Sequence, residues 1–173
     1  MSGGGEAPRP YAVSISGVRP SSYITWLQAQ QACTNAGKQL PSNAEWQAAV
    51  AGTPDPGPDD GATDCNTRSG RRLPSGSRSR CVSADGAFDM VGNVAEFAAD
   101  WIPRSGTCST WSLGVSPTGD AQCLSGVATK GEPGILFRGG MFETEASSGP
   151  LSIDGLSTPS VVGAGRTGFR CAR

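Results

Sequence analysis

The sequence predicts a single α+β domain, with helices near the start of the chain and short strands after them. Two helix signatures lie between residues 25 and 52, and apolar segments follow at 86–102, 134–140 and 167–173. Because helices and strands do not alternate, a parallel sheet built from βαβ units is disfavoured. A length of 173 residues suits one domain. The 25 glycines and 13 prolines indicate that much of the backbone is turn and loop.

The first helix is expected to begin after Thr25. Thr25 and Gln28 have the spacing of a capping box, in which the two residues satisfy each other's backbone N–H groups. Gly37 suits the left-handed conformation that ends many helices. The residues expected to form a narrow apolar face are Leu27, Ala29, Ala32, Cys33 and Ala36.

The second helix is predicted by a repeat of the same pattern. Ser42 and Glu45 form another capping box, and Gly52 is expected to end the helix. The side chains expected to face inward are Trp46, Ala49 and Val50.

Three stretches are predicted to lack regular structure. Residues 53–80 are crowded with Pro, Gly and Asp and indicate a long surface excursion, and residues 103–134 are expected to form a second loop region. The start of the chain, MSGGGEAPRP, predicts that residues 1–20 are a flexible N-terminal segment or a remnant of cloning. The folded domain is therefore expected to cover residues 21–173.

Charge and composition exclude several classes of function. The net charge is −1 and no basic stripe is visible, which disfavours nucleic acid as a partner. No run approaches the ~20 apolar residues of a membrane helix, and no signal peptide is recognisable. The chain has no histidine, which excludes Ser-His-Asp hydrolysis, Cys-His catalysis and His-ligated metals.

The six cysteines favour disulfide bonds. They lie at positions 33, 65, 81, 108, 123 and 171, and none forms a CxxC pair, so structural zinc is disfavoured. An even number suggests an oxidising compartment, such as a cell surface or the extracellular space, or the cytosol of a hyperthermophile. Buried free thiols are the alternative. Six cysteines allow fifteen connectivities, and the sequence by itself leaves these open.

Four phrases, taken in order, resemble the formylglycine-generating-enzyme (sulfatase-modifying factor) family. They are ITWLQAQQACTNAGKQLPSNAEWQAAVAG, GAFDMVGNVAEFAADW, FRGG and GFRCAR, and they extend from residue 24 to the end of the chain. The resemblance implies a C-type-lectin-like fold. It also implies structural roles for Trp46 and for the arginines of the RGG and GFR phrases.

The resemblance also implies one disulfide, between Cys33 and Cys171. The remaining cysteines are then expected to pair with their neighbours along the chain, as Cys65–Cys81 and Cys108–Cys123. In some members of the family the G-N-x-x-E turn binds calcium, which would here involve Asn93 and Glu96. Hard oxygen ligands suit calcium, but Glu96 pairing only with an arginine is the alternative. No other cofactor is implied.

The groups that perform catalysis in this family are missing from the sequence. Formylglycine-generating members use a cysteine pair in the segment before GFRC, and no cysteine lies between Cys123 and Cys171. Related sulfoxide-forming iron enzymes require a histidine cluster. The sequence therefore predicts that the protein is not an enzyme.

The C-terminal part, residues 138–173, also resembles the variable proteins of diversity-generating retroelements, which share this fold. In those proteins an RGG-to-GFR segment carries scattered variable positions on a fixed scaffold. The implied function is non-catalytic binding of a protein or other macromolecule. The candidate binding residues are Phe142, Thr144, Asp154, Leu156, Ser157, Val161, Val162 and Arg166. Apolar side chains among glycines suit a shallow binding patch, although some could pack inward.

Two other functions compete with this interpretation. One is a divergent member of the formylglycine-generating-enzyme family with a catalytic or regulatory role. The other is a structural module of a larger surface protein. The sequence does not identify the ligand.

Overall fold

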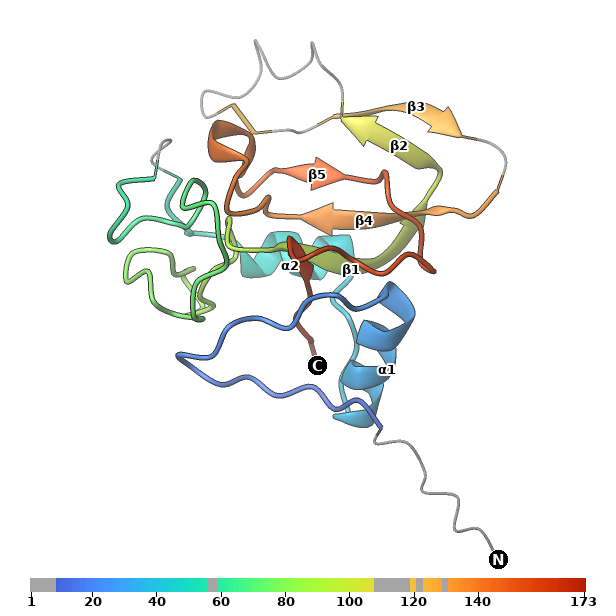
Figure 1. Ribbon diagram of the computed structural model, residues 1–173, viewed down its shortest axis with the longest axis horizontal. Coiled ribbons are helices and arrows are strands. Elements are labelled where there is room, and N and C mark those ends of the chain that lie inside the picture. The colour runs from blue at the N-terminus through green and yellow to red at the C-terminus, as the bar shows by residue number, and fades with distance from the viewer. Residues whose placement is uncertain (1–8, 56–58, 108–118, 121–122, 129–130) are drawn as a thin grey trace, which may run out of the picture.

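A computed structural model describes residues 9–55, 59–107, 119–120, 123–128 and 131–173. Two helices precede a set of short strands, as the α+β prediction requires (Figure 1). The elements are α1 (Trp26–Asn35), α2 (Asn43–Ala49), β1 (Ala95–Ile102), β2 (Arg104–Thr107), β3 (Leu124–Ala128), β4 (Gly134–Arg138), the 3₁₀ turn η1 (Glu145–Ser147), β5 (Ile153–Asp154) and β6 (Thr167–Gly168).

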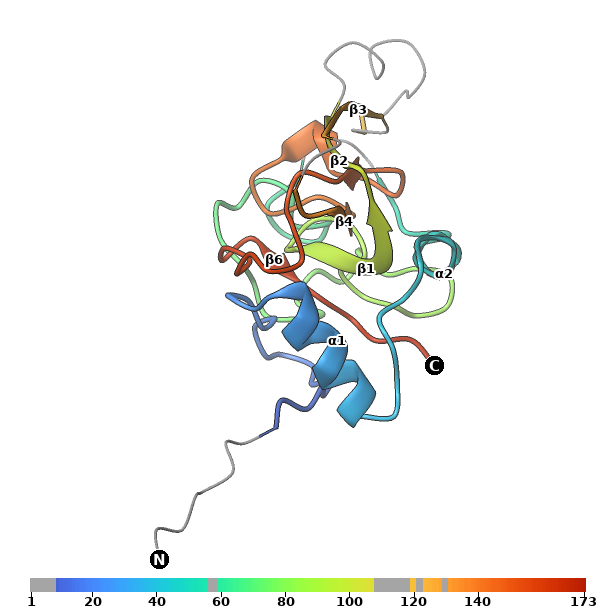
Figure 2. The same cartoon turned by 90° about the vertical axis from the view of Figure 1, so that its right-hand side faces the viewer.

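The main sheet has four strands in the order β5-β4-β1-β6. β1 lies near its centre, antiparallel to β4 and parallel to the short β6. The register shifts between Phe97 and Trp101, which marks an irregularity in the ladder between β1 and β4. β2 and β3 form a separate antiparallel pair (Figures 1 and 2).

Both helices begin as the sequence predicts. Thr25 and Gln28 form one capping box, and Ser42 and Glu45 form the other. Ala29, Ala32 and Cys33 of the first helix are buried. Leu27 was expected on the same face, but it is 52% exposed. It lies in the first turn, and the buried side of this helix is set by the three small residues.

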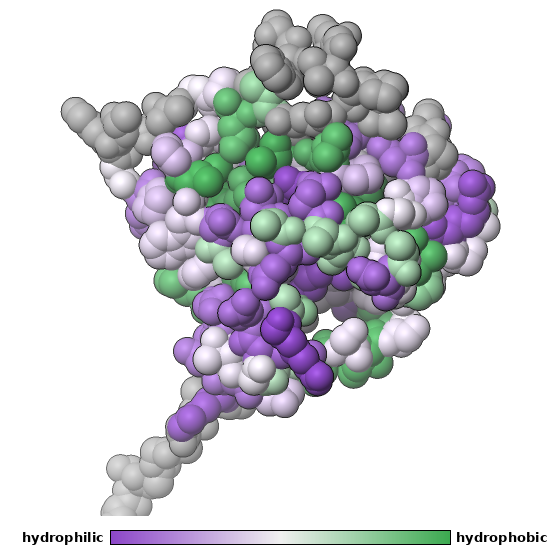
Figure 3. Space-filling model, turned by 180° about the vertical axis from the view of Figure 1, so that it is seen from behind, coloured by the Kyte–Doolittle hydropathy of each residue, from purple (hydrophilic) through white to green (hydrophobic). Residues whose placement is uncertain are grey.

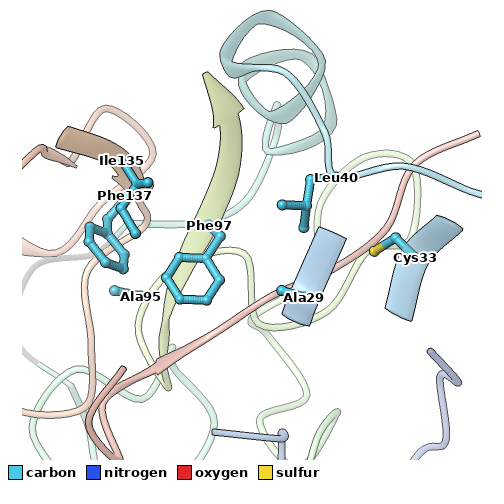
Figure 4. Packing of buried hydrophobic residues seen from close by; sticks show 7 residues of the cluster. All are labelled: Ala29, Cys33, Leu40, Ala95, Phe97, Ile135 and Phe137. Carbon is cyan, nitrogen blue, oxygen red and sulfur yellow. The ribbon is translucent and has the colours of Figure 1, made fainter. Parts of the chain in front are cut away.

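The core has two parts, one on each face of β1. On the first face, Phe97 lies between α1 and the β4 residues Ile135 and Phe137 (Figure 4). On the second face, Trp46 of α2 is fully buried and packs with a cluster that contains the Cys65–Cys81 disulfide. The predicted role of Trp46 in the core is confirmed.

The two disulfides that the described residues hold match the predicted pairing. Cys33–Cys171 joins α1 to the end of the chain across 138 residues, and Cys65–Cys81 closes a loop of 16 residues. The predicted Cys108–Cys123 pair lies outside the described residues, because Cys108 is not among them.

Three loop predictions require correction. The β2–β3 pair falls within residues 103–134, which were expected to be loop. Residues 53–80 include buried Cys65, Asn66 and Thr67, so this stretch is only partly a surface excursion. The N-terminal stretch also contributes to the fold from residue 10 onward, since Ala12 donates to the carbonyl oxygen of Ala32 and packs on the core. Backbone hydrogen bonds of Ala12 and Gly17 therefore connect the described part of this stretch, from residue 9 onward, to the rest of the domain.

The surface is mixed in hydropathy. Seen from behind, hydrophilic and apolar residues are interspersed, and apolar residues concentrate toward the upper part of the view (Figure 3). Within the described ranges, no helix is both long enough and apolar enough to span a bilayer.

Candidate ligand-binding pocket

The C-terminal segment, residues 141–167, starts and ends beside the same residue of the central strand. Arg138 pairs with Glu96 on one side of β1, and Gly168 pairs with Glu96 on the other side. Adjacent strands lie about 4.8 Å apart, so the sheet holds the two ends of the segment about 10 Å from each other. The fold therefore fixes where the segment leaves the sheet and where it returns.

Arg138 fixes the first end of the segment. Its guanidinium lies 4.6 Å from the ring centre of Trp46. It donates hydrogen bonds to three acceptors, the side-chain oxygens of Asn43 and Gln47 and the carbonyl oxygen of Pro150. Burial lowers the pKa of Arg138 to about 10, which Asp120 opposes, so the group stays charged at neutral pH.

The two glycines after Arg138 are required by space and by backbone conformation. Gly139 has φ 85° and Gly140 has φ 74°, both in the region that disfavours other residues. A Cβ on Gly139 would lie 2.5 Å from the carbonyl oxygen of Met90. A Cβ on Gly140 would overlap the Ser148 hydroxyl. At the RGG phrase the backbone therefore packs closely against two other chain segments, at Met90 and at Ser148.

Arg170, which is half-buried, fixes the second end through an ion pair with the buried Glu96. Two Arg170 nitrogens, Nε and Nη2, lie 2.6 and 2.5 Å from the two carboxylate oxygens of Glu96. Trp46 donates a further hydrogen bond of 2.7 Å to Glu96 Oε2. Arg170 also donates to the carbonyl oxygen of Phe88 at 3.1 Å. The predicted structural role of both arginines is confirmed.

Asp89 lies next to this ion pair and is unusual in two ways, its backbone conformation and the burial of its carboxylate. Its φ is 57°, in the left-handed region, and its carboxylate accepts a hydrogen bond of 2.8 Å from the backbone of Gly76. Burial raises the pKa of Asp89, although the Gly76 hydrogen bond and the positive charge of Arg170 act in the opposite direction. The folded state therefore disfavours the charged form of Asp89.

We expect Asp89→Asn to raise the melting temperature at pH 7. Asparagine tolerates the left-handed conformation and carries no charge to bury. Because the pKa of Asp89 is raised in the folded protein, the charged form costs stability as the pH rises through that value. The advantage of the variant should shrink as the pH is lowered, because the raised pKa lets the folded protein protonate Asp89 more readily than an ordinary aspartate. Melting curves of both proteins at pH 7 and at lower pH test the prediction, and an advantage that grows on acidification would contradict it.

A pocket of about 350 Å³ opens between the C-terminal segment and the main sheet. Its floor consists of alternate residues of two strands, Ala95 and Phe97 of β1 and Ile135 and Phe137 of β4. These residues face the same side of the sheet as α1 (Figure 4). The rings of Phe97 and Phe137 are 5.2 Å apart. The helix α1 covers one part of this sheet face. The C-terminal segment covers the other part, where the pocket lies.

Six of the eight candidate binding residues line this pocket. They are Thr144, Asp154, Ser157, Val161, Val162 and Arg166. Val161 and Val162 are 51% and 56% exposed and adjacent in the chain, so together they add apolar surface at the pocket. The structure thus brings together side chains that are spread over 23 positions of the sequence, from 144 to 166.

The other two candidates lie elsewhere, and one of them is a correction. Phe142 is only 8% exposed, so it belongs to the interior and not to a display surface. It lies two residues after Gly140, close to the tight Gly139–Gly140 turn. Leu156 is 62% exposed but lies outside the pocket lining.

Thr144 lines the pocket but also holds the segment together. Its hydroxyl accepts from the backbone N–H of Met141 at 2.9 Å and contacts the Ser148 hydroxyl. The hydroxyl of Ser147 donates to the Thr144 carbonyl oxygen at 2.6 Å. Thr144 is therefore a structural residue as well as a wall residue, which its place in a Gly- and Ser-rich stretch did not reveal.

The pocket floor was missed by sequence reasoning. Ala95 and Phe97 were assigned only to an apolar segment, and Ile135 and Phe137 only to a short strand, although their alternation was visible. Alternation predicts one shared face. It does not tell whether a helix, a loop or a cavity covers that face, which depends on the path of the C-terminal segment.

The residues of the predicted calcium site do not fit a metal ion. Both carboxylate oxygens of Glu96 are used by Arg170, and one also by Trp46. Asn93 Oδ1 accepts from Asn66 at 3.0 Å and from the backbone of Leu73 at 2.9 Å. These oxygens already accept hydrogen bonds from the protein, so the side chains of the GNxxE turn stabilise the fold. The structure instead has the alternative arrangement, in which Glu96 pairs with an arginine, Arg170.

We expect the melting temperature to be the same in millimolar calcium and in a chelator. A ligand that binds the folded state must raise its stability by mass action, and the turn at Asn93 offers it no free carboxylate. Differential scanning calorimetry checks this. A rise of several degrees that depends on calcium concentration and disappears in Glu96→Gln would contradict it.

A family model for the "Sulfatase-modifying factor enzyme 1-like domain" matches residues 6–173. The chain belongs to this family. The match includes the helices, the main sheet and the C-terminal segment, so the resemblance carried by the four sequence phrases is confirmed. No curated protein sequence matches the chain.

Solved structures support the same fold. The chain is similar to the Major Tropism Determinant M1 variant, with a TM-score of 0.58, 20% identity and 85% of this chain covered. The P3c variant of that protein gives a TM-score of 0.57, also at 20% identity and 85% coverage. CarF gives a TM-score of 0.56 at 17% identity, covering 94% of this chain and 76% of that chain. The fold of this sulfatase-modifying-factor-like domain is therefore C-type-lectin-like.

The match with the tropism determinants is partial on their side. This family member spans 36% of the length of those chains. At this level of identity, the similarity establishes the fold and leaves the function to be argued from the pocket.

Proposed function

We propose that this chain is a non-catalytic ligand-binding domain whose C-terminal segment forms the binding site, as in the variable proteins of diversity-generating retroelements. One observation carries the proposal: six of the eight candidate residues gather around a single pocket. The ends of the segment are fixed by Arg138 and Arg170, whose contacts lie outside the pocket. Apart from Gly140 and Thr144, which belong to both, scaffold and binding surface are thus different residues, which is what a variable site requires.

The chemistry of the pocket supports binding over catalysis. The chain has no histidine, and no cysteine or lysine occurs among the described residues that line the pocket. The hydroxyls of Ser147 and Thr167 donate to backbone carbonyl oxygens, so neither is paired with a base. An activated nucleophile needs such a partner within hydrogen-bond reach.

The similar structures agree with this proposal in two respects. First, their name, Major Tropism Determinant, describes proteins that decide tropism. Second, several of these structures are variants of one protein. A scaffold that exists in several variants suits a changeable recognition surface. We propose a protein or other macromolecule as the ligand. The two disulfides accord with an extracellular or cell-surface location.

The proposal is tested by sequencing the DNA around the gene. A retroelement origin predicts a reverse-transcriptase gene nearby and a near-copy of the 3′ end of this gene. Differences between the copies should be biased toward adenines and should fall in codons of the pocket walls, such as Val161, Val162 and Arg166. The codons for Gly139, Gly140 and Arg170 should be identical. Absence of the repeat, or differences spread evenly along it, would overturn the proposal.

The separation of scaffold and surface predicts tolerance in the exposed set. Changing Leu156, Val161, Val162 and Arg166 together to serine should alter the free energy of unfolding by less than about 1 kcal/mol, because exposed positions carry little folding energy. The control is Phe142→Ala, which should cost about 3–5 kcal/mol by opening a cavity. Urea unfolding measures both. Loss of folding in the quadruple variant would place these residues in the core.

A further inference from the structure

The floor of the pocket suits an aromatic group. Phe97 and Phe137 are tilted by 43° with ring centres 5.2 Å apart, and Ala95 and Ile135 complete an apolar base. Aromatic rings prefer tilted or offset neighbours, and such pairs add to the free energy gained by burial. The volume of about 350 Å³ lies at the small end of ligand pockets. The pocket therefore has room for one ring-sized group.

The charged and polar side chains at the pocket differ in whether the protein itself supplies their hydrogen-bond partners. Arg166 forms an ion pair with Glu143, so its positive charge is compensated at the rim. Asp154 Oδ1 accepts from the backbone N–H of Leu156 at 2.9 Å. Among the described residues, neither Asp154 Oδ2 nor the Ser157 hydroxyl has a hydrogen-bond partner, and both residues line the pocket.

From this combination we infer that the pocket binds one aromatic side chain that carries a hydrogen-bond donor, an indole or a phenol, presented by a protein partner. The inference rests on the proposed binding function. The ring would lie against Phe137, with the fully buried Phe97 behind it and Val161 and Val162 beside it, and its N–H or O–H would be donated to Asp154 Oδ2. Tryptophan and tyrosine are the side chains that combine an apolar body with one polar tip.

Other occupants fit less well. An aliphatic side chain would fill the floor but leave Asp154 Oδ2 unpaired once water is displaced, which is costly for a charged acceptor. A lysine would be attracted by Asp154, but its ammonium would lose water above an apolar floor. A carboxylate would be repelled by Asp154. An aromatic side chain with a donor would cover the apolar floor and also donate a hydrogen bond to Asp154.

The experiment compares four probes on the intact protein labelled with nitrogen-15. The probes are the N-acetyl amides of tyrosine, phenylalanine, tryptophan and lysine, titrated into the protein while two-dimensional amide NMR spectra are recorded. Tyrosine and tryptophan probes should shift the amides of Ser157, Val161 and Val162. The phenylalanine probe, which lacks only the hydroxyl of the tyrosine probe, should bind about tenfold more weakly, because hydrogen bonds to charged groups are among the stronger ones.

A pair of variants separates the donor contact from simple burial. In Asp154→Ala, the tyrosine and phenylalanine probes should bind with equal affinity, whereas Asp85→Ala, on an exposed loop outside the pocket, should keep the tenfold preference. The dispersed amide spectrum shows in the same measurement whether each variant is folded. The inference is overturned if no probe shifts pocket amides, if wild-type protein binds both aromatic probes equally, or if lysine binds best. None of these results depends on whether the gene has a diversifying repeat, so the two proposals fail separately.

Discussion

Replacing Cys33 and Cys171 together with serine is expected to lower the free energy of unfolding by about 5 kcal/mol on the chain-entropy description. The disulfide spans 138 residues and is the longest covalent closure among the described residues. Removing it releases the C-terminal strand from α1 in the unfolded chain. Urea denaturation of the double variant and of the wild type measures the difference.

The matched comparison is the second disulfide. The Cys65–Cys81 loop of 16 residues should contribute about 3 kcal/mol, because a shorter loop gains less from closure. Both Cys33 and Cys81 are fully buried, so the two double variants lose similar packing. If the shorter disulfide proves equally or more important, strain or packing would dominate over chain entropy, and the expectation would be wrong.

Glu96→Gln is expected to destabilise the protein by up to about 3–5 kcal/mol, the cost of removing one partner of a buried ion pair, because Glu96 is buried although the Arg170 side chain is 26% exposed. The amide keeps the size of the side chain and still accepts from Trp46, so the change isolates the charge. Arg170 would then remain half-buried beside Phe88 with its main counter-ion gone. Thermal melting and urea unfolding both report the loss.

A surface pair provides the control for this substitution. Glu143 pairs with Arg166, and the two side chains are 34% and 57% exposed. Glu143→Gln should therefore change stability by less than about 1 kcal/mol, as is typical of solvated ion pairs. Equal effects of the two glutamine substitutions would mean that the Glu96 pair is screened by water, contrary to its burial.

Local signals in the sequence were sufficient for the helices. Each capping box depends on residues three positions apart, so the start of each helix is determined locally. The structural arginines of the RGG and GFR phrases were implied by the family resemblance and not by a local signal. The fold class followed from the order of these elements.

Features set by distant contacts were not predictable in the same way. Phe142 lies among glycines and serines, and only the turn at Gly139 and Gly140 shows that its ring points inward. β2 and β3 have sequences rich in glycine and serine, RSGT and LSGVA, so their pairing is set by each other and not by strand propensity. The pocket itself arises where the C-terminal segment crosses β1 and β4.

The pairing of Glu96 with both Arg138 and Gly168 fixes both ends of the intervening stretch, whose exposed part around Val161 and Val162 we regard as a replaceable cassette. Its two attachment points belong to one rigid sheet, so a different cassette would meet the same geometry at either end. Each doubling of the length of a flexible loop costs only about 0.6 kcal/mol of closure entropy. Variation at this exposed part need not be limited to exchanging side chains, because insertions of several residues beside Val161 and Val162 would leave Phe142 and the pairing of β5 with β4 in place. The domain could therefore serve as a carrier for grafted peptides of different lengths.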